Sequence, residues 1–140
     1  IRLSNSNTEE MAKEIIKRWP EVRRVYPDSA GSARSTTSNR SDHQILRDFQ
    51  FQVIAKKANP PVKDRLNALN RKLLNANGKV GMTVDPKCNY LIKDLEQCQR
   101  DKNGSLDKSD AALSHALDAC SYLIDMKWPI ERKVGKSVQW

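Results

Sequence analysis

Hydrophobic residues recur along the chain with two different spacings, and the spacing separates helices from strands. In five segments they return every three or four residues, as on one face of an α-helix: about residues 8–19, 42–48, 62–77, 87–100 and 108–128. In three shorter segments they form the compact or alternating runs typical of β-strands: residues 22–26, 49–53 and 80–84. The pattern therefore predicts five helices and three strands.

Residues that start or stop helices support these boundaries. Asn7 precedes a first turn that carries two acids, and Ser41 can cap the second helix. Pro20 stops the first helix, and Gly78 is a predicted C-cap of the third. Helices and strands alternate until the last two helices, an order typical of an α/β layered domain with parallel strands. We expect one domain over residues 1–130 and a basic tail over residues 131–140.

The charge of the chain indicates an acidic partner. Its 140 residues include 25 Lys and Arg against 17 Asp and Glu, a formal net charge of +8. A basic domain of this kind often binds nucleic acid, although many basic domains bind nothing. Four cations lie opposite the apolar stripe of the third helix, which predicts a DNA-binding face: Lys63, Arg65, Arg71 and Lys72. No apolar run approaches the ~20 residues of a membrane span.

Other function classes find no support in the sequence. The phosphate-binding pattern G-x-x-x-x-G-K-[ST] is absent, so the chain contains no P-loop ATPase. Its three cysteines are widely spaced without a C-x-x-C pair, which indicates neither a disulfide scaffold nor a zinc site. Each cysteine falls within a helical pattern, where a buried thiol in a reducing compartment is the simplest interpretation.

Asp28 is the first candidate for chemistry. It follows directly on the predicted strand 22–26, and sites in open α/β sheets form at the carboxyl ends of strands. The loop after it carries Arg34 and Arg40, which could contact a DNA backbone. The alternative is an ordinary turn acid, because Pro-Asp-Ser-Ala-Gly suits a turn. Asp85 also follows a predicted strand, but Asp-Pro is a common way to begin a loop.

The last helix carries the second candidate. His115 and Asp118 are three residues apart on one face of the segment SHALDACSYLID, among small side chains. A carboxylate among small residues can pack closely against the end of a strand, so Asp118 could share a metal ion with Asp28. The alternative is a surface His–Asp pair that contributes a few tenths of a kcal/mol.

Taken in order, several segments resemble the C-terminal nuclease domain of the large terminase subunit of tailed phages and prophages. They are SNSNTEEMA, VYPDSAGSARSTTSNRSDHQIL, NPPVKDRLNALNRKLLNANG, VDPKCNYLIKDLE and DKSDAALSHALDACSYLIDMKWP. The resemblance covers about residues 1–130 and implies a ribonuclease H/RuvC-like fold, with a central mixed sheet flanked by helices. It also implies a metal-dependent endonuclease that cuts concatemeric double-stranded DNA during genome packaging.

In that family three acids hold two divalent metal ions. Asp28 in YPDSAG matches the second acid and Asp118 in HALDA matches the third, while His115 could orient a carboxylate or contact phosphate. Mg²⁺ or Mn²⁺ suits such an all-oxygen site, and two ions ~4 Å apart would hydrolyse the phosphodiester. The first acid is expected on a strand before Ile1, so the nuclease domain is predicted to be incomplete at its N-terminus.

The resemblance further implies an N-terminal ATPase domain in the full protein, and the portal and the small terminase subunit as partners. We expect the cytoplasm of the bacterial host cell as its location, with neither secretion nor membrane attachment. Two alternatives stay open: a non-catalytic module that binds DNA or docks on the portal, and a RuvC-like junction resolvase.

Overall fold

The computed structural model describes residues 3, 5–33, 39–103, 106–107, 109–110 and 113–130 of the chain. Its elements are α1 (Thr8–Arg18), β1 (Arg24–Val25), the 3₁₀-helix η1 (Ser29–Ser32), α2 (Asp42–Asp48), β2 (Gln52–Val53), α3 (Val62–Leu73), α4 (Asn89–Gln97) and α5 (His115–Lys127). The five predicted helices are confirmed. None of the described helices is long and apolar enough to cross a membrane.

The first two helices start where their capping residues predict. The side chain of Asn7 accepts a hydrogen bond from the backbone N–H of Glu10, and the carboxylate of Glu10 accepts one from the N–H of Asn7. The hydroxyl of Ser41 accepts from the N–H of Gln44 at the start of α2. α1 ends at Arg18, just before Pro20, which cannot continue a helix.

Two parallel strands make up the sheet of the described chain. Arg24 pairs with Gln52, and Val25 pairs with Val53. The predicted strand over residues 80–84 is wrong: the N–H of Gly81 donates to the backbone oxygen of Lys72 at the end of α3, and no described strand pairs with the segment. Met82 and Val84 do turn inward in alternation, but Val80 is 57% exposed. The structure is therefore a helix-rich α/β arrangement with a small sheet, and the predicted central mixed sheet is not observed among the described residues.

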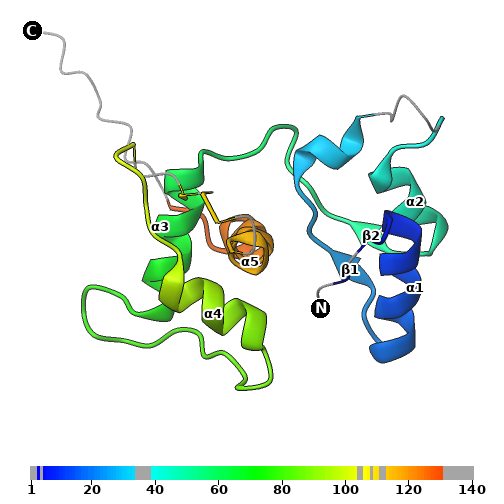
Figure 1. Cartoon of the computed structure of the whole chain (residues 1–140). Coiled ribbons are helices and arrows are strands. Elements are labelled where there is room, and N and C mark those ends of the chain that lie inside the picture. The colour runs from blue at the N-terminus through cyan, green and yellow to red at the C-terminus, as the bar shows by residue number, and fades with distance from the viewer. Residues whose placement is uncertain are drawn as a thin grey trace, which may run out of the picture.

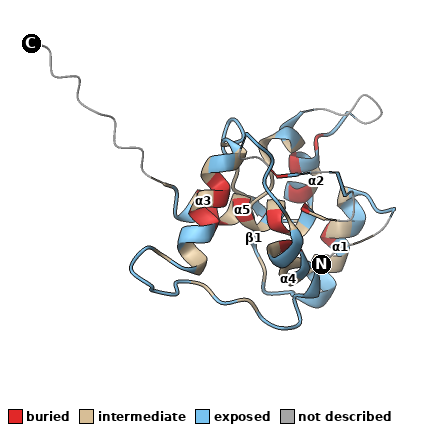
Figure 2. Ribbon diagram, turned by 60° about the vertical axis from the view of Figure 1, so that its left-hand side comes forward, coloured by how far each residue is buried: buried red, intermediate tan, exposed pale blue. Residues whose placement is uncertain are grey.

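The apolar side chains gather into two separate cores. Ala12, Leu46 and Phe51 form the first, between α1, α2 and the strands. The second lies between α3, α4 and α5 and contains Leu66, Ala68, Leu69, Leu106, Leu117 and Ile124. Figure 1 shows the same division into two groups of elements, and Figure 2 shows the buried residues of α3 and α5 facing each other. Contacts between the two groups must therefore position any site that uses residues from both.

Helices α3 and α5 run side by side in the same direction. Arg65 near the start of α3 meets Asp118 near the start of α5, and Lys72 at the end of α3 meets Trp128 at the end of α5. Both helices are shorter than the sequence pattern predicts. α3 ends at Leu73, and Gly78 (φ 72°) instead forms a turn four residues beyond the C-cap Leu74.

α5 begins at His115, later than the expected start near residue 108. Ser114 adopts a left-handed conformation (φ 77°), which interrupts the helical path just before His115. Of the three cysteines, Cys88 is exposed, while Cys98 and Cys120 are half-buried, and all three are free thiols. The prediction of a buried thiol is therefore wrong for Cys88, which lies at the N-terminal end of α4 rather than inside it.

Candidate functional site

Asp28 lies in a short turn three residues after β1. Its carboxylate oxygen Oδ1 accepts a hydrogen bond from the backbone N–H of Gly31 at 3.1 Å, which caps η1. The backbone oxygen of Asp28 accepts from Nε2–H of His43 at 2.7 Å. Both the N–H and the hydroxyl of Ser29 donate to Oδ1 of Asn59, at 2.7 and 2.6 Å. The carboxylate of Asp28 is therefore held on a loop fastened from two sides.

His43 was not predicted from the sequence, yet it supports this loop from inside. Its side chain is only 4% exposed, and its ring lies against Gly31. A Cβ atom at position 31 would come within 3.0 Å of the imidazole, so a larger residue would push the ring or the loop aside. The close approach of ring and backbone therefore favours glycine here. The only sequence signal is a histidine in the first turn of a helix that starts soon after the loop.

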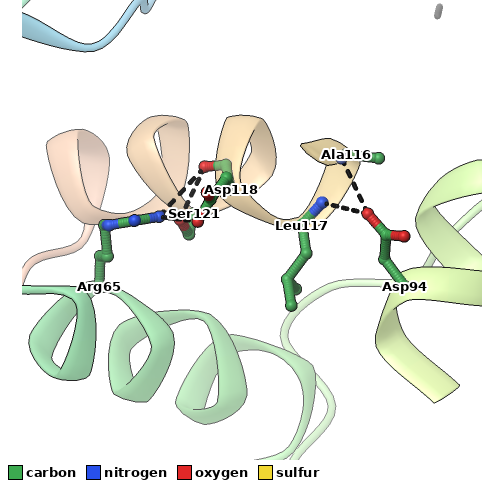
Figure 3. A network of polar contacts seen from close by, with 6 residues as sticks. All are labelled: Arg65, Asp94, Ala116, Leu117, Asp118 and Ser121. Carbon is green, nitrogen blue, oxygen red and sulfur yellow. Dashed lines mark hydrogen bonds and ion pairs between the residues drawn. The ribbon is translucent and has the colours of Figure 1, made fainter. Parts of the chain in front are cut away.

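Asp118 faces α3 and is paired with a buried cation. Its Oδ1 lies 2.8 Å from Nη1 of Arg65. The side chain of Arg65 is 3% exposed, and the side chain of Asp118 is 20% exposed. The same Nη1 donates to the hydroxyl of Ser121, which in turn donates to the backbone oxygen of Asp118. Figure 3 shows this network between the two helices. The guanidinium also stacks 4.4 Å above the ring of Tyr122.

A second acid of α5, Asp125, shares a small cavity with the loop of Asp28. Asp125 is 3% exposed and forms an ion pair with Lys56, which follows β2. It lines a cavity of about 10 Å³ together with Pro27 and Ser29, the two neighbours of Asp28. A space of that size holds about one water molecule. Asp125 therefore connects the two groups of elements at the carboxyl ends of both strands.

Comparison with protein families identifies the chain. Residues 2–127 match the family described as the Terminase RNaseH-like domain. The chain belongs to the terminase RNase H-like domain family. Comparisons with curated proteins and with solved structures gave no match. The match covers β1, the loop of Asp28 and all of α5, and so it confirms the family resemblance of the sequence.

The terminase family implies a divalent metal, and the described side chains meet that requirement only in part. Asp28 and Asp118 carry carboxylate oxygens, the ligand type that Mg²⁺ and Mn²⁺ prefer. Within the described ranges, however, no three His, Cys, Asp or Glu side chains lie together as a metal site. Asp118 is also neutralised by Arg65. A metal that used Asp118 would therefore compete with a buried guanidinium for the same carboxylate.

The predicted basic residues of this terminase domain do not form a single face. Arg65 is buried, so the expectation that it shares an exposed surface with its neighbours on α3 is wrong. Lys63 and Arg71 are exposed and Lys72 is half-buried. Arg40 lies 2.8 Å from the carboxylate of Asp48, and Arg34 falls outside the described residues. Arg65 was misassigned because an arginine beside an apolar stripe can pair with an acid on another helix, which the local pattern cannot reveal.

His115 is the first residue of α5, where its side chain is exposed. The helix start that carries it is held by Asp94 of α4, a residue not predicted to matter. Oδ2 of Asp94 accepts from the backbone N–H of Ala116 at 2.8 Å and of Leu117 at 3.0 Å, and its side chain is 4% exposed. A signal was present, because Asp94 lies three residues after Leu91 and four before Cys98, on the apolar stripe of α4.

Asp94→Ala is expected to lower the free energy of unfolding by about 1–3 kcal/mol, because it leaves buried N–H groups of the first turn of α5 without an acceptor. Asp94→Asn keeps an oxygen acceptor and should cost less, mainly the loss of a charge near a helix N-terminus. Urea unfolding followed by circular dichroism measures both. Glu96→Ala, an exposed acid on the same helix, is the control and should change stability by no more than about 0.5 kcal/mol. Equal stability of Asp94→Ala and the control would contradict the capping role.

Proposed function

We propose that this chain is the nuclease part of a phage DNA-packaging terminase, and that it cuts concatemeric double-stranded DNA during genome packaging. The observation that carries the proposal is the match to the terminase RNase H-like family over residues 2–127. The net charge of +8 agrees with a polyanionic substrate. In the full gene product we expect an ATPase domain, the portal and the small terminase subunit as partners, in the cytoplasm of the host bacterium.

Asp28 and Asp118 are the residues that we assign to the chemistry. The loop of Asp28 is fastened by His43 and Asn59, so its carboxylate has little freedom to move away from a substrate. Asp118 keeps a fixed direction through Arg65 and retains partial exposure. A divalent Mg²⁺ or Mn²⁺, when bound to such carboxylates, would activate water and stabilise the leaving oxygen of a phosphodiester. We assign to His115, the exposed first residue of α5, a contact with a phosphate oxygen.

The test is metal-dependent nicking of supercoiled plasmid by the full-length gene product that contains this chain. Nicked and linear DNA are expected with Mn²⁺ or Mg²⁺, and excess EDTA should stop the reaction, because carboxylates alone cannot activate water for this hydrolysis. Agarose gel electrophoresis measures the products. Cutting that continues in EDTA, or no cutting with either metal, would contradict the proposal. A preference for four-way junctions over linear duplex would instead favour a junction resolvase.

A non-catalytic module that binds DNA or docks on the portal is the second candidate. One observation favours it: Asp118 is already neutralised by Arg65, an arrangement that stabilises the fold without any metal. Such a module would bind duplex DNA equally well with and without EDTA, and log K would fall steeply with log salt. Strict dependence of binding or cutting on Mg²⁺ or Mn²⁺ would exclude it.

A further inference from the structure

A basic cleft opens at the end of the molecule where α3 and α5 both terminate. Its volume is about 580 Å³, within the roughly 300–1,000 Å³ typical of ligand sites. Arg71 and Lys72 reach it from the last turn of α3, and Lys127 and Trp128 from the end of α5. Trp128 is 48% exposed, a large fraction for an indole. This cleft, which we call the Trp128 cleft, is not explained by the candidate acids Asp28 and Asp118, which do not line it.

The walls of the Trp128 cleft are fixed by backbone contacts. The side-chain oxygen Oδ1 of Asn75 accepts from the N–H of Lys79 at 2.9 Å, which folds the turn after α3 and brings Lys79 to the cleft. The N–H of Gly81 donates to the backbone oxygen of Lys72 at 3.0 Å. A Cβ at position 81 would lie 3.0 Å from that same oxygen, so glycine permits this close approach. The cleft is therefore a built feature of the fold and not a gap between loose loops.

The indole of Trp128 is held in place at the edge of the cleft. The backbone N–H of Trp128 donates to the backbone oxygen of Ile124 at 2.8 Å, which closes the last turn of α5. Nζ of Lys72 lies 4.0 Å from the ring centroid, and Nζ of Lys127 lies 5.9 Å from it. A planar aromatic group thus lies close to two ammonium groups, and Trp128 keeps about half of its surface open to solvent.

The charge of the Trp128 cleft favours an anion. The side chains that line it include four cations, Arg71, Lys72, Lys79 and Lys127, and no acid. The C-terminal ends of two helices meet nearby, and each carries the equivalent of about half a negative charge. Four positive charges outweigh about one negative charge, so the cleft remains positive. Cations beside an exposed aromatic ring match the combination that binds single-stranded nucleic acid.

We propose that the Trp128 cleft binds a single-stranded segment of DNA, with an unpaired base stacked on Trp128 and the neighbouring phosphates on the four cations. In a duplex the faces of the bases are already stacked on each other, so an exposed indole gains little from it. Stacking with a base is stronger than an exposed cation–π contact, so a base can take the place of Lys72 on the ring. Lys72 is then released to pair with a phosphate. This inference rests on the proposed DNA-cutting function in one respect: the single strand would come from a frayed or newly cut DNA end.

The test compares the binding of a fluorescent oligothymidylate of about 20 nucleotides, enough to cross one stacking site, with that of a blunt duplex of equal length. Fluorescence anisotropy is measured in EDTA, so that no cutting occurs. Trp128→Ala should weaken single-strand binding by about 5- to 150-fold and leave duplex binding within about twofold. Trp19→Ala is the matched control, because Trp19, the C-cap residue of α1, is 40% exposed and does not line the cleft, so its loss should have no effect. Circular dichroism confirms that each variant is folded.

Substitution of the cations gives a second, independent measurement. Arg71→Gln and Lys79→Gln should each reduce the slope of log K against log salt by about 0.7 for the single strand. Unchanged single-strand binding by Trp128→Ala would overturn the proposal, as would an equal loss of duplex binding. A competition experiment gives a further check. If polyglutamate displaced the labelled oligonucleotide at the same concentration as unlabelled oligothymidylate, the cleft would be a general anion site and the proposal would be overturned. If the wild-type protein bound the single strand in this way but did not cut plasmid with Mg²⁺ or Mn²⁺, only the proposed nuclease function would be contradicted.

Discussion

Asp28→Asn and Asp118→Asn are each expected to reduce Mn²⁺-dependent plasmid nicking by at least about 100-fold, more than the roughly 10- to 100-fold lost when an outer-shell partner of a metal is removed. Both substitutions remove a charge and keep an oxygen. Asparagine is a good N-cap, so position 28 can still accept from the N–H of Gly31. At position 118 the amide oxygen can still accept from Arg65. The variants should therefore lose cutting while they remain folded. Single-turnover gel assays measure the cutting, and circular dichroism spectra should match that of the wild type.

Two further variants make this result specific. Asp85→Asn removes an exposed acid whose Oδ1 accepts from the N–H of Lys87 in a turn, and it should cut as the wild type does. Asp125→Asn removes the acid of α5 that lies beside the neighbours of Asp28, and it should lower stability but retain cutting. Cutting that persists in both Asp28→Asn and Asp118→Asn would contradict the nuclease proposal. Loss of cutting in Asp125→Asn with activity retained in Asp118→Asn would move the assignment on α5 to Asp125.

Arg65→Met is expected to lower the free energy of unfolding by about 2–4 kcal/mol, within or just below the range for removing one partner of a buried ion pair. Methionine fills part of the volume, but it leaves Asp118 without its cation, Ser121 without a donor, and the Tyr122 ring without the guanidinium. Asp118 is 20% exposed and can regain some water, which keeps the loss below the largest values. Urea unfolding monitored by circular dichroism at neutral pH provides the measurement.

Lys63→Met is the matched control for Arg65→Met. It removes a cation from the same helix at an exposed position and should change stability by no more than about 0.5 kcal/mol. Arg65→Lys should fall between the two, because an ammonium keeps the charge but cannot reproduce the planar guanidinium over Tyr122. If Arg65→Met were as stable as Lys63→Met, the ion pair seen between α3 and α5 would contribute nothing.

Local patterns in the sequence predicted the helices well, because helix starts and apolar stripes are encoded by nearby residues. Asn7 and Ser41 act as the caps that their positions indicate, and α3 buries Leu66 and Leu69 as its stripe requires. The prediction of a strand over residues 80–84 is wrong for a physical reason. Apolar and polar side chains can alternate in any extended segment with one side buried, whereas a strand also needs a neighbouring strand for its backbone hydrogen bonds. No local pattern specifies that neighbour.

The candidate site was harder to predict, because its polar contacts join residues that lie far apart in the chain. Asp118, Ser121 and Asp125 form one polar stripe on α5, visible in the sequence as an i, i+3, i+7 pattern. What the stripe contacts was not visible. Asp118 meets Arg65 of α3, and Asp125 meets Lys56 after β2. The pairing of Arg65 with Asp118 decides whether each of them can reach DNA or a metal, and only the fold supplies it.

The parallel packing of α3 and α5 has a consequence for how the chain folds as it is synthesised. Contacts in the first group close over short separations: Thr8 bonds to Asp42, 34 residues away, so this group is complete early. Arg65 must wait for Asp118, 53 residues later, and Lys56 waits for Asp125 across 69 residues. Until α5 emerges from the ribosome, the apolar stripe of α3 and its guanidinium face water. The second core therefore forms last, and α5 is the element that completes it.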